Sequence, residues 1–138
     1  MNSNPGDDIP CICGRLRRAS RALTRHYDEA LTPVGLTITQ FSVLRTLSSM
    51  DRPTLVELSE RTAHEKSALW RTLQPLIRHD WIAAQPGRVQ RFALTDAGRE
   101  QLERARPLWK TAQAAVSGTL GPGEAALIEL LNEVETHV

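Results

Sequence analysis

The sequence predicts a mainly α-helical fold that carries one small β-wing. Three observations support this prediction, and two of them come from residues 55–98. Apolar residues there recur every three or four positions, and two short extended runs separated by Pro86-Gly87 follow. The third is the size and composition of the chain. Its 138 residues fit one domain, and 41% hydrophobic and 24% charged residues are ordinary proportions for a globular chain.

The first predicted helix begins at about Cys11, after a polar tail of residues 1–10 that we expect to be mobile. Thr32, Pro33 and Gly35 end this helix. Its apolar stripe consists of Ile12, Leu16, Ala19, Leu23, Tyr27 and Ala30. We expect a second helix with Thr39 as its N-cap and with the apolar members Phe41, Val43, Leu44 and Leu47.

Two short helices are predicted next. Thr54 precedes the first of them and Glu57 follows three residues later, which is a capping-box pattern, and the helix is expected to end near Thr62. The second has an apolar stripe of Leu69, Leu73, Leu76 and Ile77. Its opposite face carries small, hydroxylated and basic groups, which suit base edges and phosphates: Lys66, Ser67, Ala68, Trp70, Arg71 and Gln74.

A β-hairpin is predicted after these helices. Asp80 tolerates the left-handed conformation that the turn into the hairpin requires. The extended runs Trp81–Ala84 and Val89–Leu94 flank a turn with Arg88 at its tip, where a basic side chain suits a DNA minor groove. The segment Asp51-Arg52-Pro53 is expected to add one short strand. Two short helices followed by such a wing form a winged helix-turn-helix, whose second helix fits the major groove.

The C-terminal part is predicted to form two more helices. Thr95 caps a long helix from Asp96 towards Val116, and residues 118–123 break it. A final helix from about Glu124 buries one apolar side, made of Leu127, Ile128, Leu130, Leu131 and Val134. Because a single short chain covers that side only partly, residues 11–31 and 96–138 are predicted to form a dimer interface around a winged helix-turn-helix of about 37–98.

Charge is unevenly distributed along the chain, although the net charge of +1 is too small to indicate a nucleic-acid partner. Residues 11–27 contain no acid and five arginines, Arg15, Arg17, Arg18, Arg21 and Arg25. Residues 107–138 contain Lys110 against Glu124, Glu129, Glu133 and Glu135. We interpret the arginines as a solvated helix face, with a clamp for a ligand carboxylate as the alternative.

Six segments of the chain resemble the MarR family of bacterial transcription regulators. They are Leu-x-Glu-Leu-Ser-Glu-Arg at 55–61, Lys-Ser-x-Leu-x-Arg-x-Leu-x-x-Leu at 66–76, Trp-Ile at 81–82, Ala-Leu-Thr-Asp-Ala-Gly-Arg at 93–99, and the upstream segments 16–28 and 35–41. The resemblance covers roughly residue 11 to the C-terminus. It implies a homodimer that binds a pseudo-palindromic operator, acts as a repressor and is released by a small effector.

The family frame assigns Lys66, Ser67, Ala68, Trp70, Arg71 and Arg88 to double-stranded DNA. Arg61 and Arg91 are expected to contact phosphate rather than base. The chain departs from the family where Trp70 replaces a small residue, where Glu65 occupies the cap of the second short helix, and where the wing lacks an Asp-x-Arg pair.

Family members bind small, often aromatic, acids between the DNA-binding part and the dimer helices. The corresponding pocket walls here are Leu23, His26, Tyr27, Trp81 and Trp109, for which core and interface packing is the preferred interpretation. Cys11 and Cys13 allow a thiol-based redox sensor, as in a peroxide-sensing branch of the family, or two thiols without a role. A zinc site at this pair lacks ligands.

No Gly-rich phosphate loop, nucleophile elbow or paired-His metal motif is visible, so we expect neither an enzyme nor a bound cofactor or metal. No segment resembles a signal peptide or a transmembrane helix, which favours a cytoplasmic protein. Three functions therefore stay open. They are an effector-responsive DNA-binding regulator, a redox-sensing regulator on the same frame, and a winged-helix module for protein contact without DNA binding.

Overall fold

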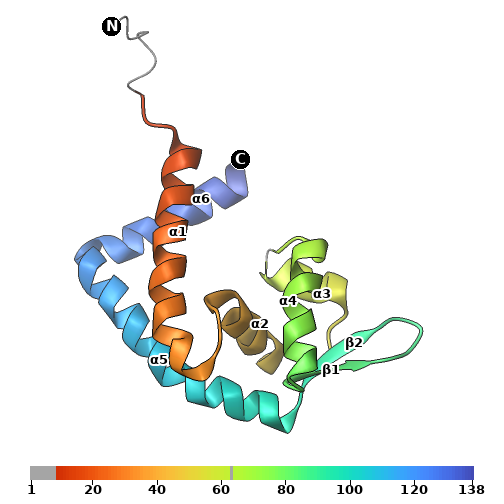
Figure 1. Ribbon diagram of the computed structural model, residues 1–138. Helices are drawn as coiled ribbons and strands as arrows, with labels where there is room; N and C mark the ends of the chain where they lie inside the picture. The colour runs from red at the N-terminus through yellow and green to blue at the C-terminus, as the bar shows by residue number, and fades with distance from the viewer. Residues whose placement is uncertain (1–8, 63) are drawn as a thin grey trace, which may run out of the picture.

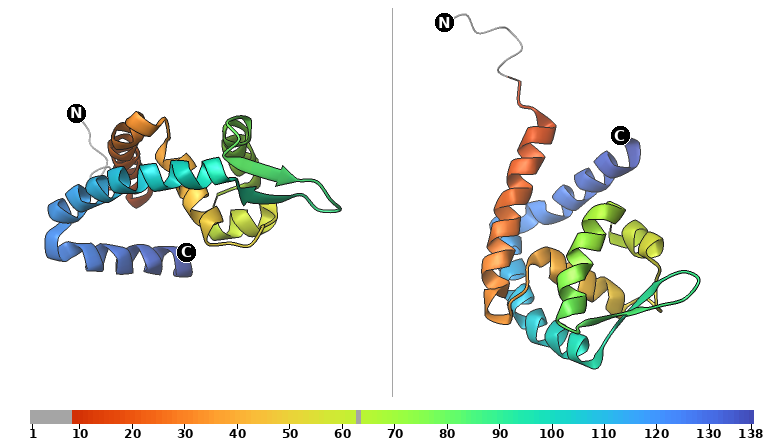
Figure 2. Two further views of the ribbon diagram at one scale, coloured as in Figure 1. Left: turned by 90° about the horizontal axis from the view of Figure 1, so that it is seen from below. Right: turned by 45° about the vertical axis from the view of Figure 1, so that its right-hand side comes forward.

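The computed structural model describes residues 9–62 and 64–138, which form two lobes joined by one long helix (Figure 1). The elements in chain order are α1 (Ile12–Leu31), η1 (Thr32–Val34), α2 (Ile38–Ser48), α3 (Leu55–Thr62), α4 (Lys66–Arg78), β1 (Ile82–Gln85), β2 (Arg91–Leu94), α5 (Asp96–Leu120), η2 (Gly121–Gly123) and α6 (Glu124–His137). Helices α2–α4 and the two strands form one lobe, and α1, the far half of α5 and α6 form the other (Figures 1 and 2). The predicted tail falls mostly outside the described residues.

The second helix starts two residues earlier than the sequence predicts. Its N-cap is Thr37 and not Thr39, because Gln40 completes a capping box with Thr37. The Thr37 hydroxyl accepts the Gln40 N–H at 3.2 Å, and the Gln40 Oε1 accepts the Thr37 N–H at 3.0 Å. These two bonds satisfy backbone donors that the first helical turn otherwise leaves free.

The cap residues predicted for α3 and α5 are confirmed, although the Glu57 carboxylate of the predicted capping box accepts from the Thr54 hydroxyl at 3.2 Å. Glu57 N–H donates to the Thr54 hydroxyl at 3.2 Å, and α3 ends at Thr62 as expected. Gly98 N–H donates to the Thr95 hydroxyl at 2.9 Å at the start of α5. Asp80 has a φ of 60°, the left-handed conformation predicted for the turn between α4 and β1.

The core of the winged-helix lobe consists of the apolar stripes predicted from the periodicity. Leu69, Leu73 and Leu76 of α4 are fully buried, as is Leu58 of α3. They pack with side chains of α2, of the hairpin and of the first turns of α5: Phe41, Leu44, Leu47, Ile82, Phe92 and Leu102. This packing fixes α4 on one side and leaves its other side outward.

The wing is an antiparallel pair in which Ile82 lies opposite Leu94 and Gln85 opposite Arg91. The first strand lies one residue later than predicted and the second is two residues shorter, so residues 86–90 form the connecting loop, which extends away from the lobe (Figure 2). The expected third strand is present as one isolated bridge between Thr54 and Arg91. The Phe92 N–H donates to the Pro53 carbonyl at 3.0 Å beside it.

One prediction at the C-terminal end is wrong. Helix α5 continues through Gly118 to Leu120, and the chain turns at Gly121, whose φ is +55°. The apolar side of α6 is only partly covered within one chain, as expected, because Leu127 and Leu131 are half-buried beside α1 and α5, whereas Ile128, Leu130 and Val134 are 53%, 63% and 41% exposed. None of the helices in residues 9–62 and 64–138 combines the length and the hydrophobicity that a bilayer crossing requires.

Candidate nucleic-acid interface

The outward side of α4 carries the side chains that the sequence assigns to DNA. Lys66, Ser67, Trp70 and Arg71 are exposed and Ala68 is half-buried, and we call these five residues the recognition face. The three fully buried leucines on the opposite side hold the helix in one rotation. A hydroxyl, two cations and an indole therefore project together from a rigid helix, as contacts with base edges and phosphates require.

The turn before α4 positions the start of this helix. The Ser59 hydroxyl donates to the His64 carbonyl at 2.6 Å, which ties the segment entering α4 back to α3. Glu65 is the N-cap, and its side chain makes no capping hydrogen bond. The first backbone N–H groups of α4 are thus free of a side-chain acceptor, and such groups bind phosphate oxygens in helix-turn-helix proteins.

Trp70 is anchored on one side and free on the other. Its ring lies edge-to-face with Phe92, with ring centroids 6.4 Å apart and an interplanar angle of 67°. Phe92 belongs to β2 and is fully buried, so the wing supports the indole. With 39% of the residue exposed, Trp70 presents an apolar surface in the middle of the recognition face.

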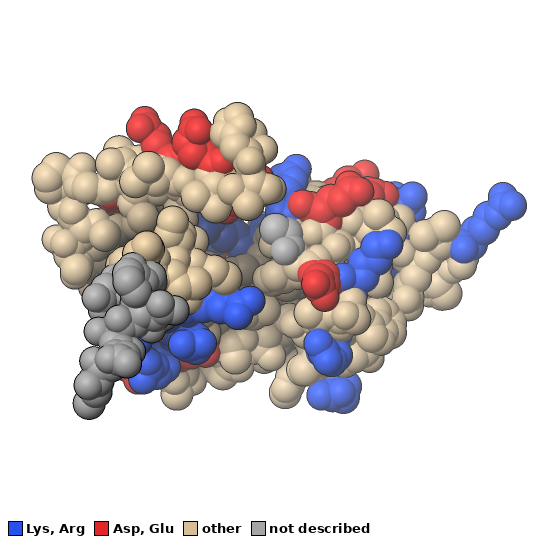
Figure 3. All heavy atoms as spheres, turned by 90° about the horizontal axis from the view of Figure 1, so that it is seen from above, with Lys and Arg blue, Asp and Glu red and all other residues tan. Residues whose placement is uncertain are grey.

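The two wing arginines have different environments. Arg88 is exposed in the loop between the strands, and a basic side chain extends from the far end of the wing (Figure 3). Arg91 instead donates from a terminal guanidinium nitrogen to the Arg52 carbonyl at 2.9 Å and lies 3.8 Å from a Glu57 carboxylate oxygen. Arg91 therefore ties the wing to the segment before α3 as well as facing solvent.

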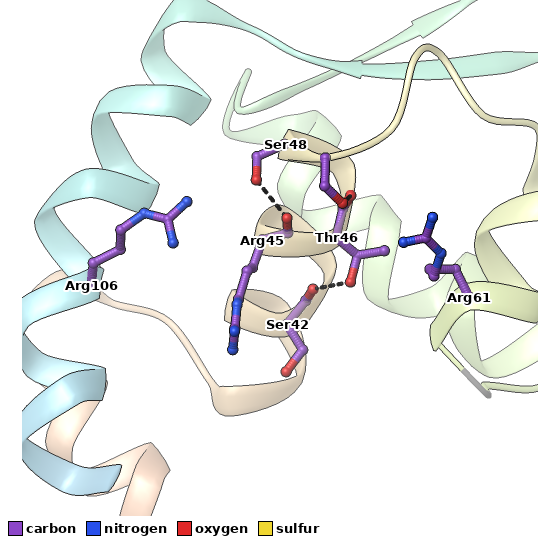
Figure 4. A pocket seen from close by; sticks show the side chains of 7 residues that line it. Ser42, Arg45, Thr46, Ser48, Arg61 and Arg106 are labelled. Carbon is purple, nitrogen blue, oxygen red and sulfur yellow. Dashed lines mark hydrogen bonds between the residues drawn. The ribbon is translucent and has the colours of Figure 1, made fainter. Parts of the chain in front are cut away.

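Arg61 does not join the recognition face. It projects from the last turn of α3 toward α2 and lines a separate hollow with Arg45 and Arg106 (Figure 4). Neither Arg45 nor Arg106 is among the site residues predicted from the sequence. The available signal was the polar stripe of α2, because Ser42, Arg45, Thr46 and Ser49 recur at helical spacing on one face.

Three of the five predicted effector-pocket residues come together. Leu23, His26 and Tyr27 of α1 line a groove of about 620 Å³ between α1, α5 and α6. His26 Nε2 is hydrogen-bonded to the Ala112 carbonyl at 3.0 Å, and the Tyr27 hydroxyl donates to Gln113 Oε1. Burial, and to a lesser degree the Glu124 carboxylate, raise the pKa of Tyr27 above its usual value of 10.0.

Trp81 and Trp109 lie outside this groove, so the five residues do not form one pocket within a chain. Trp81 stacks on His79 at the base of the wing, with ring centroids 4.6 Å apart. Trp109 stacks on Phe41 at 5.6 Å, and the Arg45 guanidinium lies 4.5 Å from its ring centroid. Both tryptophans therefore have packing roles, which was the preferred interpretation.

Cys11 and Cys13 are both exposed at the start of α1. Cys11 is the N-cap residue, and its side chain makes no capping hydrogen bond. In the described part of the chain, no group of three His, Cys, Asp or Glu side chains is placed to hold a metal ion. The pair of thiols is accessible to reagents in solution.

A winged helix-turn-helix with an outward basic recognition helix, flanked by terminal helices, defines the class of winged-helix DNA-binding proteins. Comparison with solved structures identifies the branch. MosR, a transcriptional regulator of M. tuberculosis solved in complex with DNA, is 37% identical, and the match covers 94% of this chain and 100% of MosR with a TM-score of 0.79. A second MosR structure matches with 36% identity, 94% and 95% coverage and a TM-score of 0.82.

More distant structures share the fold. The apo form of MarR from E. coli is 24% identical, with 94% and 99% coverage and a TM-score of 0.71. The repressor CouR bound to a 23-mer DNA duplex is 23% identical, with 98% and 99% coverage and a TM-score of 0.84. No protein-family model and no curated protein sequence matches the chain. On the MosR similarity, the chain belongs to the MarR family of transcription regulators, as the resemblance in its sequence predicts.

Proposed function

We propose that this protein is a homodimeric transcriptional repressor that binds a pseudo-palindromic DNA operator and releases it when a small effector binds. The recognition face of α4 carries the proposal, because its exposed Lys66, Ser67 and Arg71 stand on a helix anchored by fully buried leucines. The similarity to MosR, which was solved with DNA, supports the same function.

Dimerisation is inferred from the uncovered side of α6. Ile128, Leu130 and Val134 are large apolar side chains left exposed in one chain. A second copy is the favoured occupant, because the arginine-rich α1 and the glutamate-rich α6 of two copies complement each other in charge. A two-fold dimer presents two recognition helices to successive major grooves, about 34 Å apart.

Release of the operator follows from that spacing. An effector that binds more tightly to a dimer with another separation of the recognition helices shifts the population toward it. The two helices then no longer meet consecutive major grooves, and affinity for the operator falls. The available free energy is limited to the ligand's preference for one of the two arrangements.

DNA binding is tested with Arg71→Ala. Duplexes selected from random sequence by the wild-type protein are titrated at moderate salt, and the variant is expected to bind them at least about fivefold more weakly, since a base-directed arginine contributes about 1–3 kcal/mol. Arg104→Gln, on α5 and away from α4, is the matched control. Equal affinity of wild type and Arg71→Ala for every selected duplex contradicts the proposed recognition face.

The dimer is tested separately with Leu130→Glu. Sedimentation of the wild type is expected to give the mass of two chains, whereas a buried charge at residue 130 favours single chains. Glu129→Gln, the neighbouring residue, is expected to leave the mass unchanged. A single-chain mass for the wild type at micromolar concentration rules the dimer out.

A thiol-based redox sensor is the second candidate, favoured by the two exposed thiols at the start of α1. A peroxide oxidises one thiol to a sulfenic acid with loss of water, and the second thiol displaces a further water to form the Cys11–Cys13 disulfide. The oxidised form of MarR from E. coli, 25% identical over 95% of this chain, shows that oxidation occurs in a related protein. The disulfide constrains the first turn of α1, next to the proposed dimer interface.

The redox candidate predicts that peroxide releases wild-type protein from DNA, with a mass loss of two hydrogen atoms. The Cys11→Ser/Cys13→Ser protein is expected to stay bound under the same treatment. If the wild type stays bound as well, the thiols do not control DNA binding.

A further inference from the structure

The outer face of α2 carries a polar stripe that neither the core nor the recognition face uses. Ser42, Arg45, Thr46 and Ser49 recur at helical spacing and are half-buried or exposed. The opposite face of the same helix holds the buried Phe41, Leu44 and Leu47. A surface stripe of this kind forms part of a binding site when side chains from other elements lie beside it.

Arg61 and Arg106, from two other elements, lie beside the stripe and line the same open hollow of about 510 Å³. Arg106 reaches toward α2 from α5, and Arg61 reaches toward it from α3 on the other side (Figure 4). Helix α4 lies behind α2 in this view, so the hollow opens on the side of α2 that faces away from α4. It is also separate from the groove lined by Leu23, His26 and Tyr27.

The three arginines retain hydrogen-bonding capacity. Among the residues that the structure describes, neither Arg45 nor Arg61 forms an ion pair, and no acidic side chain lines the hollow. Arg106 contacts Glu103 through Nε at 2.8 Å, which leaves its two terminal nitrogens free. The Arg45 guanidinium lies over Trp109, and this arrangement leaves the N–H groups at its edge available.

The hydroxyl groups of the hollow are mostly committed to the backbone. Thr46 donates to the Ser42 carbonyl at 2.8 Å, Ser48 to the Arg45 carbonyl at 2.5 Å, and Ser49 to the Thr46 carbonyl at 2.9 Å. Their protons are therefore unavailable to a ligand. The free donors are guanidinium groups, whose planar fork of N–H groups matches phosphate oxygens.

We propose that this hollow binds a small molecule that carries phosphate, with Arg45 and Arg106 as its ligands and Arg61 at its far edge. Three guanidinium groups line the hollow and, among the described residues, only that of Arg106 is paired with a carboxylate, which favours a multiply charged anion. The volume falls within the range of about 300–1,000 Å³ typical of small-molecule sites. Free inorganic phosphate and a phosphate ester share this chemistry. A phosphate on the DNA backbone is disfavoured, because the hollow faces away from the recognition helix.

The position of the hollow gives binding a regulatory consequence, and this part of the inference rests on the proposed function. Arg45 belongs to α2, which packs on the recognition helix, and Arg106 belongs to α5, which continues into the second lobe. A ligand held by both of these arginines restrains the winged-helix lobe relative to the helices of the proposed dimer interface. Occupancy of the hollow is thereby linked to the separation of the two recognition helices.

Calorimetry on the full chain without DNA tests the site. Inorganic phosphate, a sugar phosphate and, as a monoanion control, acetate are titrated in low-chloride buffer. We expect saturable binding of one or both phosphate compounds, and Arg45→Gln and Arg106→Gln each to weaken it about tenfold, the value of a charge-assisted hydrogen bond. Arg104→Gln, on the same helix as Arg106 but outside the hollow, is expected to bind like wild type. Arg45→Lys controls for the loss of packing on Trp109.

Three outcomes overturn the proposal. They are no saturable binding of either phosphate compound, binding that persists in the Arg45→Gln/Arg106→Gln protein, and loss of duplex affinity in that protein without any small-anion binding. The last assigns the hollow to the DNA backbone. The calorimetry samples contain no DNA, so a failure to bind phosphate leaves the DNA-binding proposal unaffected. Failure of the Arg71→Ala test likewise leaves the anion site unaffected.

Discussion

A Cβ atom at Gly98 would lie 2.0 Å from the carbonyl oxygen of Trp81. That carbonyl accepts a hydrogen bond from the Thr95 N–H at 3.1 Å, so the backbone at the base of the wing cannot withdraw easily. The first turn of α5 and the start of β1 therefore touch through backbone alone. This contact sets the direction in which the hairpin leaves the lobe.

Gly98→Ala is expected to destabilise the fold by about 1–3 kcal/mol, the usual effect of overpacking a close contact. The measurement is urea unfolding followed by circular dichroism. Gly118→Ala is the matched control on the same helix, since a Cβ there meets nothing within 4 Å and alanine favours a helix over glycine by about 1 kcal/mol. Equal stability of Gly98→Ala and wild type contradicts the close contact.

Trp70→Ala is expected to change which duplexes are preferred more than it changes overall affinity. An exposed indole on the recognition face suits the methyl group of thymine. Replacing a contacted thymine by deoxyuridine should then cost the wild type about 0.8 kcal/mol, roughly fourfold, and cost Trp70→Ala nothing. The measurement is fluorescence anisotropy on selected duplexes. If no thymine replacement distinguishes the two proteins, Trp70 does not contact a thymine methyl.

Arg88→Ala is expected to weaken binding to all duplexes, and most to those whose minor groove is narrow where the wing tip lies. A single phosphate contact contributes about 0.9 to the slope of log affinity against log salt, so the slope should fall by about that amount. Titrations at several salt concentrations measure it, and Arg88→Lys should keep the wild-type slope. An unchanged slope for Arg88→Ala places the wing tip away from the DNA backbone.

Arg91 has a structural contact that competes with the predicted phosphate contact. Arg91→Ala removes the hydrogen bond to the Arg52 carbonyl and is expected to cost about 0.5–1.5 kcal/mol of folding free energy. The exposed pair with Glu57, at 3.8 Å, adds little. Urea unfolding and the salt slope, measured on the same variant, separate the roles. Unchanged stability with a reduced slope assigns Arg91 to DNA.

Tyr27→Phe removes a hydrogen bond between α1 and α5 and should cost about 0.5–1.5 kcal/mol at neutral pH. The pKa of Tyr27 is raised in the folded protein above 10.0, chiefly by burial and then by Glu124. The contribution of the neutral phenol is therefore fully present below pH 10.0 and is lost as pH rises through the folded-state pKa. Unfolding curves above that pH should show the wild type losing stability faster than Tyr27→Phe.

Most of the winged-helix lobe was predictable because its signals are local. The stripe of Leu69, Leu73 and Leu76, the caps Thr54 and Thr95, and the left-handed Asp80 each depend on neighbours within a few residues. Thr37 was missed although Gln40 provided its capping partner in the sequence. Local periodicity also predicts which face of α4 is exposed.

The remainder depends on contacts between distant segments, which spacing does not encode. Arg61 was expected to contact DNA phosphate, yet it extends from α3 toward α2 and lines a hollow there. The five residues predicted to line one effector pocket do not lie together, because Trp109 packs on Phe41 and Trp81 packs on His79. The apolar pattern of α6 predicted a buried side, but within the described residues α1 and α5 cover only part of it.

The uncovered side of α6 has a genetic consequence. Residues such as Ile128 lie on a different element from α4, so a chain with a damaged recognition helix keeps everything it needs to pair with an intact one. In a cell that carries both gene copies, the proposed dimers would mix, and each mixed pair would reach only half of its operator. A mutant allele altered in α4 is then dominant over the normal allele, whereas one altered in α6 is recessive.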